Sequence, residues 1–197
     1  MTNVIAYIDG FNLFHAIDEL NDETIKWLDL WKLSESILGE GETLVAVKYF
    51  TAYATWREAG YRRHQRYART LDVCGVDVIL GQFKRKRMKC QAECGKRFWT
   101  HEEKETDVNV GANLVADALQ GRFDRALIIS ADTDMGAGIE VAKREAPDKL
   151  IQVVAPPGRF GRARDLQPIF EITRGRLRKA AMAEHDVDYI MNGNILG

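Results

Sequence analysis

The sequence predicts an α/β protein with a mostly parallel central sheet flanked by helices on both faces. Short apolar runs rich in β-branched residues alternate along the chain with longer segments of helical periodicity. The recurring order of strand, helix and strand is typical of parallel sheets joined by right-handed crossovers. No internal repeat or low-complexity linker interrupts this order, so we expect one folded domain.

The strand candidates follow one another in order along the chain. Each is a run of apolar residues too short for an ordinary helix, and each contains Val, Ile or aromatic side chains. They cover residues 4–8, 43–53, 76–83, 125–130 and 149–155, with a shorter candidate at 169–173.

Helical patterns fill the gaps between these strands, with apolar residues three and four positions apart. A long polar insertion at 84–103 breaks the pattern, and its length and charge indicate a functional loop or hairpin. We place the domain at residues 1–182 and a weakly structured tail at 183–197. The predicted helices cover residues 11–20, 57–74, 107–121 and 135–146.

Length and composition are those of a globular domain. A chain of 197 residues can bury roughly 70% of its unfolded surface. Hydrophobic residues make up 46% and charged residues 29%, which excludes a disordered chain and a disulfide scaffold. No apolar run approaches the ~20 residues that cross a bilayer. We therefore expect no membrane partner and a cytoplasmic location, with which the three cysteines agree.

The net charge of −1 conceals a strong asymmetry along the chain. Residues 1–43 carry nine acids and two lysines, whereas residues 57–97 carry twelve Lys and Arg against four acids. A nearly neutral protein can therefore present a basic face, and such a face favours partners that carry phosphate groups.

Acidic residues stand where the predicted parallel strands end. Asp9 ends the first strand, Asp132 and Asp134 follow the fourth, and Asp107 opens the helix that precedes the fourth. Because ligands of α/β sheets bind beyond the carboxyl ends of the strands, we expect these carboxylates to converge. Asn12 lies one helical turn beyond Asp9, where it can donate to an oxygen or orient a carboxylate.

Carboxylates that converge repel one another unless a cation neutralises them. Oxygen ligands without His or Cys favour Mg²⁺ or Mn²⁺, and such a cation can activate a water molecule for attack on a phosphodiester. Three of the acids have a plainer interpretation as helix caps or first-turn acids, a role compatible with metal binding. The predicted metal ligands are Asp9, Asp107, Asp132 and Asp134.

Three separated segments, "AYIDGFNLFHA", "EEKETDVNVGANLVADAL" and "RALIISADTDMGAGIEVAKR", carry a family resemblance. In this order they are similar to the NYN domain, in the LabA-like (DUF88) branch of the PIN-like nuclease superfamily, over about residues 3–173. The resemblance implies a Rossmann-like PIN fold, a Mg²⁺ or Mn²⁺ site and ribonuclease activity. It implies an acidic site of Asp9, Asp107, Asp132 and Asp134, with Asn12 beside the first of them and Lys104 just before the third predicted helix.

Two groups of basic residues are candidates for binding RNA. Packed like charges directly after the third strand indicate an anionic partner, whereas a solvated helix face is the plainer interpretation of the helical group. Phe98 and Trp99 can stack on unpaired bases. The candidate RNA-binding residues are Lys84, Arg85, Lys86, Arg87 and Lys89 in the insertion, Arg62 and Arg66 on the predicted helix, and Lys104.

Cys90, Cys94 and His101 form a candidate set of zinc ligands. The Cys-x₃-Cys spacing lies within the range of structural zinc sites, but no second cysteine pair follows. Two free thiols are therefore the favoured interpretation, and zinc is the alternative.

We therefore expect a metal-dependent ribonuclease that hydrolyses single-stranded or loop RNA with water activated by Mg²⁺ or Mn²⁺. The alternative is a non-catalytic RNA-binding or regulatory module with the same fold. A phosphatase of the haloacid dehalogenase type is disfavoured, because Gly136 stands where that motif has Thr or Val. The phosphate-binding motif of P-loop enzymes is absent from the sequence. A homodimer is compatible with this fold.

Overall fold

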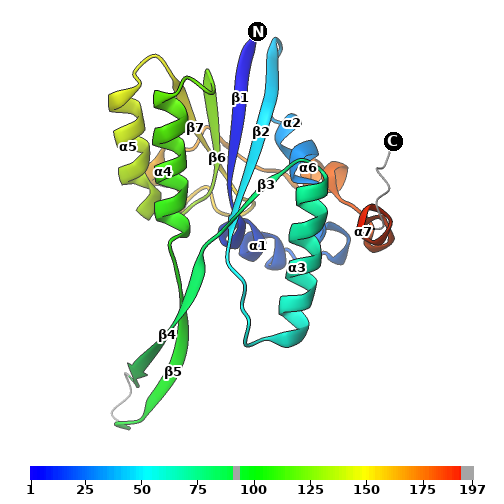
Figure 1. Cartoon of the computed structure of the whole chain (residues 1–197), viewed down its shortest axis with the longest axis vertical. Helices are drawn as coiled ribbons and strands as arrows, with labels where there is room; N and C mark the ends of the chain where they lie inside the picture. Colours follow the sequence, from blue (N-terminus) through cyan, green and yellow to red (C-terminus); the bar gives the residue numbers. More distant parts are fainter. Residues whose placement is uncertain (91–93, 192–197) are drawn as a thin grey trace.

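The computed structural model describes residues 1–90 and 94–191, and it confirms the predicted fold class (Figure 1). All pairings in the central six-stranded sheet are parallel. The strand order is β3 (Asp77–Leu80), β2 (Glu42–Thr51), β1 (Thr2–Asp9), β6 (Arg125–Ile129), β7 (Leu150–Ala155) and β8 (Phe170–Glu171).

Helices cover both faces of this sheet, with α4 and α5 on one face and α1, α2, α3 and α6 on the other. None of the helices in the described ranges is long and apolar enough to span a bilayer. The α-helices are α1 (Gly10–Asp18), α2 (Leu30–Glu35), α3 (Glu58–Val73), α4 (Thr106–Leu119), α5 (Gly136–Glu145), α6 (Arg174–Ala180) and α7 (Glu184–Met191), and the 3₁₀ helices are η1 (Glu23–Ile25), η2 (Thr133–Met135) and η3 (Arg164–Leu166).

The central strand β1 is buried on both faces, which explains its continuous apolar sequence. Val4 and Ile8 pack into the cluster that includes α1 and α2. Ile5 and Tyr7 point to the opposite cluster, formed with α4 and α5. The alternation of side chains along a strand thus feeds two hydrophobic cores, one on each face of the sheet.

The insertion predicted at 84–103 belongs to an antiparallel hairpin of β4 (Gln82–Lys89) and β5 (Arg97–Lys104). The third predicted strand, 76–83, therefore divides at Gly81 into β3 and the start of β4. A Cβ atom at Gly81 would lie 2.8 Å from the carbonyl oxygen of Lys104. The close approach of these two backbone segments therefore requires glycine. The hairpin forms a separate two-stranded sheet that projects from the body (Figure 1).

The tail predicted to be weakly structured from residue 183 is helical in its first part. Helix α7 packs beside α3, because Val187 and Ile190 are buried. The guanidinium of Arg66 on α3 also pairs with Glu184, at 3.3 Å, and with Asp188. Apolar contacts and ion pairs together fold this segment, whereas residues 192–197 of the predicted tail lie outside the described residues.

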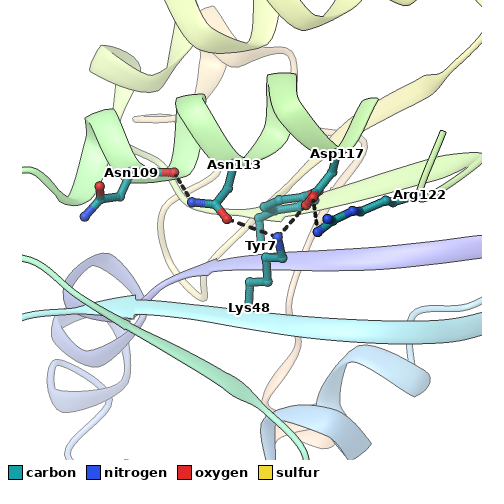
Figure 2. A network of polar contacts seen from close by, with 6 residues as sticks. All are labelled: Tyr7, Lys48, Asn109, Asn113, Asp117 and Arg122. Carbon is teal, nitrogen blue, oxygen red and sulfur yellow. Dashed lines mark hydrogen bonds and ion pairs between the residues drawn. The ribbon is translucent and has the colours of Figure 1, made fainter. Parts of the chain in front are cut away.

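A buried network of charged and polar side chains joins α4 to strands β1 and β2 (Figure 2). Asp117 is 2% exposed and accepts hydrogen bonds from Lys48 at 2.6 Å, from Tyr7 at 2.7 Å and from Arg122 at 3.2 Å. Lys48 also donates to Asn113, at 3.0 Å. Buried charges are tolerated when they are paired in this way. The network fixes α4 on the sheet, and with it the first turn of the helix, which carries one predicted site acid.

Candidate acidic site

A cavity of about 550 Å³ opens at the carboxyl ends of β1 and β6, where the strand order reverses. Four acids predicted from the sequence line it. Asp9 comes from the end of β1, Asp107 from the first turn of α4, Asp132 from the residues after β6 and Asp134 from η2. All four predicted acids therefore line the same cavity.

Short hydrogen bonds tie the end of β1 to the loop after β6. Asp9 accepts from Ser130 Oγ at 2.9 Å, and Ser130 Oγ in turn accepts from the backbone N–H of Asp132 at 3.0 Å. Asn12 accepts from the backbone N–H of Ala131 at 3.0 Å. Asn12 therefore orients the loop that carries Asp132, a positioning role within the range expected from the sequence.

Two of the acids also cap helices. Asp9 is the N-cap of α1 and accepts from the N–H of Asn12 at 3.0 Å, and Asp132 caps η2 through the N–H of Asp134 at 3.1 Å. Asp107 lies inside the first turn of α4, which begins at Thr106, so it is not the cap of that helix. Asp9 and Asp132 thus both cap a helix and line the cavity, because each lies where a strand ends and the next helix begins.

The environment of Asp9 disfavours its charge. Burial, followed by the negative charges of Asp132 and Glu103, raises the pKa of Asp9 to about 6 from an ordinary 3.8. Hydrogen bonds from Asn12 and Ser130 favour the ionised form and only partly oppose this effect. A cation in the cavity would stabilise the ionised carboxylate of Asp9.

Glu103 is a further acid of the cavity, and it was absent from the predicted site residues. Its Oε1 atom is buried and accepts no hydrogen bond from the described residues. Burial, followed by the charges of Asp107 and Asp132, raises the pKa of Glu103, and hydrogen bonding from Thr106 to the carboxylate only partly opposes this effect. Its position in the segment "EEKETDVNVGANLVADAL", four residues before Asp107, was the sequence signal, but its direction toward the cavity depends on the pairing of β4 with β5.

Three cationic side chains line the same cavity. Lys104, which was predicted, pairs with Glu102 at 2.9 Å. Arg159, which was not predicted, pairs with Glu19. Arg162 is also unpredicted, is exposed, and forms no ion pair with the described residues. Arg162 is therefore the cavity cation most available to an incoming anion.

The predicted RNA-binding residues lie in three places. Arg62 pairs with Glu58 at 2.5 Å on the exposed surface of α3, and Arg66 is held by the acids of α7. Neither lines the cavity. Lys104 does, and the remaining basic residues, Lys84, Arg85, Lys86, Arg87 and Lys89, lie on β4.

The candidate zinc ligands are only partly brought together: the side chains of Cys90 and Cys94 lie within hydrogen-bonding reach of each other, whereas His101 lies apart. His101 pairs with Arg85 across the hairpin and stacks on Trp56, with ring centroids 3.5 Å apart. Cys90 directly follows β4, five residues beyond Arg85, which is about 17 Å at the rise of an antiparallel strand. Cys90 and Cys94 are free thiols near the far end of the hairpin. The regular register of the strands thus separates His101 from the two cysteines, although all three lie close together in the sequence.

The donor chemistry of the cavity fits a hard divalent cation. Carboxylate oxygens face one cavity, and one of them, Glu103 Oε1, is buried without a hydrogen-bond donor. In the described ranges, no three His, Cys, Asp or Glu side chains form a ready ligand cluster. Mg²⁺ needs fewer than three protein ligands, because it commonly binds through one or two carboxylates and retains its waters.

No family model matches the chain. It is 29% identical to the 6-hydroxy-3-succinoylpyridine 3-monooxygenase HspA of Pseudomonas putida, in an alignment that covers 76% of this chain and 58% of that protein. This chain thus corresponds to little more than half of that relative. A solved protein of unknown function from Vibrio parahaemolyticus superposes with a TM-score of 0.55 at 14% identity, covering 87% of this chain and 91% of that one. That likeness concerns the fold.

Proposed function

We propose that this chain is a metal-dependent ribonuclease, similar to the LabA-like branch of NYN domains, that hydrolyses phosphodiester bonds in single-stranded or loop RNA. One observation carries the proposal. Asp9, Asp107, Asp132 and Asp134 come from distant parts of the sequence and line one cavity at the switch point of a parallel sheet. A purely structural role for each acid separately would not require this convergence.

Different side chains of the cavity would have different roles in hydrolysis. Asp9 and Asp132 lie deepest among the four predicted acids and would hold Mg²⁺ or Mn²⁺, with Asp107 and Asp134 nearer the solvent. When bound, such a cation polarises the phosphoryl group and lowers the pKa of water. Glu103, which lines the cavity and has a raised pKa, is suited to accept a proton from the attacking water. Arg162 is placed to bind a phosphate oxygen.

The relative named as a monooxygenase suggests a second candidate function, hydroxylation of a small pyridine substrate. The charge of the cavity argues against it. A succinoylpyridine carries its own carboxylate, and seven acidic side chains line this cavity against three cationic ones. A phosphodiester is also anionic, but a bridging cation neutralises it together with the acids. We expect no hydroxylated product when the protein is given that pyridine, a reductant and oxygen.

The deciding experiment is cleavage of end-labelled single-stranded RNA by the purified protein with Mn²⁺ or Mg²⁺. We expect cleavage that EDTA abolishes and that the Asp9→Asn/Asp132→Asn variant lacks, because both substitutions remove a charged metal ligand. Asp148→Asn is the matched control, since this exposed acid lies outside the cavity.

The outcomes separate the candidate functions. Cleavage that persists in the double variant would show that the activity resides elsewhere. Binding of RNA without cleavage under either metal would replace the nuclease with the non-catalytic RNA-binding module. Failure to bind or cleave RNA, together with product from the pyridine, would favour the monooxygenase.

A further inference from the structure

The hairpin of β4 and β5 presents two different faces. Alternate residues of a strand point to opposite sides, and directly paired residues share a side. The register pairs Lys84 with Glu102 and Arg85 with His101. It therefore assigns each residue of β4 and β5 to one of the two faces. The lysine face carries Gln82, Lys84, Lys86 and Met88 of β4 with Phe98, Thr100, Glu102 and Lys104 of β5, and the arginine face carries Phe83, Arg85, Arg87 and Lys89 with Arg97, Trp99, His101 and Glu103.

The charge of the lysine face is largely satisfied within the protein. Glu102 pairs with Lys86 at 2.8 Å and with Lys104 at 2.9 Å. These two ammonium groups hold the pKa of Glu102 down to about 2. An incoming phosphate would have to compete with this carboxylate for the same lysines.

The arginine face offers cations that no described carboxylate neutralises. Arg85, Arg87, Lys89 and Arg97 form no ion pair with the residues that the structure describes. The guanidinium carbons of Arg85 and Arg87 lie 4.3 Å and 5.9 Å from the centre of the Trp99 ring. Trp99 is 54% exposed, so one aromatic platform stands among cations and remains accessible.

Aromatic contacts connect the arginine face to the acidic cavity. Trp56 stacks on His101 and packs edge-on against Phe83, with centroids 4.8 Å apart. Phe83 in turn meets Phe11, at 5.4 Å, and Phe11 lines the cavity. Glu103, the last residue of the arginine face on β5, lines it as well. The face is therefore continuous with the candidate active site.

We propose that the arginine face of the hairpin is the track along which single-stranded RNA enters the acidic cavity, and that Lys84 and Lys86 of the lysine face are not part of it. The inference rests on the proposed function and specifies where its substrate binds. Guanidinium groups match phosphate geometry, while an exposed indole stacks on a base of any sequence. The combination fits an unpaired polynucleotide better than a duplex, whose bases are stacked inside.

The test compares variants that remove equal charge from opposite faces of one strand. Arg85→Gln/Arg87→Gln changes the arginine face, and Lys84→Gln/Lys86→Gln is its matched control. Binding of a fluorescein-labelled oligouridylate is measured in EDTA over a range of salt concentrations, so that cleavage does not contribute. We expect the arginine-face variant to bind about tenfold more weakly, with a salt slope smaller by about 1.4 for two lost phosphate contacts. The lysine-face variant should change affinity by about twofold at most.

A second pair of variants tests the stacking platform. Trp99→Ala should weaken binding about fivefold or more while leaving the salt slope unchanged. Phe98→Ala is the control, because Phe98 is similarly exposed, at 51%, on the opposite face. Circular dichroism and thermal melting confirm that all four variants are folded.

Three outcomes would overturn the proposal. Equal weakening by the arginine-face and lysine-face variants would make binding a matter of net charge. Unchanged binding in both would place the RNA elsewhere, and a changed oligomeric state of the arginine-face variant would assign this face to a second copy of the chain. A failure of the proposed nuclease is distinguishable, because binding to the arginine face would persist without cleavage in Mn²⁺.

Discussion

Asp9 has two roles. It caps the N-terminus of α1, and it places a carboxyl group in a buried, acidic cavity. Its pKa of about 6 means that the folded protein holds this proton more tightly than the unfolded chain does. Stability should therefore fall as the pH rises from about 4 to about 6 and remain lowered above that range. The full effect is about 3 kcal/mol, by the conversion of a pKa shift into free energy.

Asp9→Asn should accordingly stabilise the metal-free protein at neutral pH while abolishing cleavage. Measured by urea unfolding in EDTA, the gain of the variant over the wild type should be small near pH 4 and reach about 1–3 kcal/mol at pH 7.5. Asp148→Asn should show no such gain, because Lys149 holds the pKa of this exposed acid below its usual range. A gain that is equal at both pH values would contradict the assignment of the shift to Asp9.

The identities of the site residues could be predicted to the extent that each stands at a boundary between elements. Asp9 ends the buried strand β1 and Asp132 follows the buried strand β6, and the parallel order of the sheet brings them to the same edge. Glu103 and Arg162 could not be assigned in the same way. The direction of Glu103 is set by the register of a hairpin whose two faces are both polar, and Arg162 lies in an irregular segment before η3.

At the scale of elements, α4 and α5 meet at two glycines, one on each helix. A Cβ atom at Gly138 would lie 2.8 Å from the Cα of Gly111, closer than real Cβ contacts occur. This approach sets the spacing of the helices, and Asp107 lies in the first turn of α4 while Asp134 lies two residues before the start of α5. Helix spacing and acid spacing are therefore coupled.

Gly138→Ala should force the two helices apart and destabilise the protein by about 1–2 kcal/mol, since the strain of overpacking exceeds the better helix propensity of Ala. Gly136→Ala on the same helix is the control. Its Cβ would meet Leu166 at 3.6 Å, an ordinary contact, so the midpoint of urea unfolding should stay unchanged or rise. A stabilised Gly138→Ala variant would show that the helices can separate without strain.

At the scale of the whole molecule, the fold was predictable because the central strands β1 and β6 are buried on both faces and have continuous apolar sequences. A loop or hairpin was expected at 84–103, but its two strands could not be placed, because Lys, Arg and Glu on both of its faces hide the alternation that marks a strand. Helix α7 was missed for a similar reason: Val187 and Ile190 are too few to give a helical period, and their burial depends on α3.

The molecule consists of a body that contains the acidic cavity and a hairpin whose strands pair only with each other. No residue of β4 or β5 belongs to the buried hydrophobic clusters, so the body should not need the hairpin to fold. Replacing residues 85–101 by Asn-Gly would close the paired residues Lys84 and Glu102 with a two-residue turn. Glu103 and Phe83 would remain in place at the cavity.

The shortened protein should separate chemistry from substrate binding. Hydrolysis of bis(p-nitrophenyl) phosphate in Mn²⁺ should stay within about twofold of the wild type, because this small diester reaches the cavity without the hairpin. Cleavage of single-stranded RNA should fall about tenfold or more in kcat/KM, since remote contacts that hold the polymer are lost. Asp9→Asn/Asp132→Asn should lose both activities. Equal loss of both activities on shortening, in a variant that melts like the wild type, would mean that the hairpin acts in the chemical step itself.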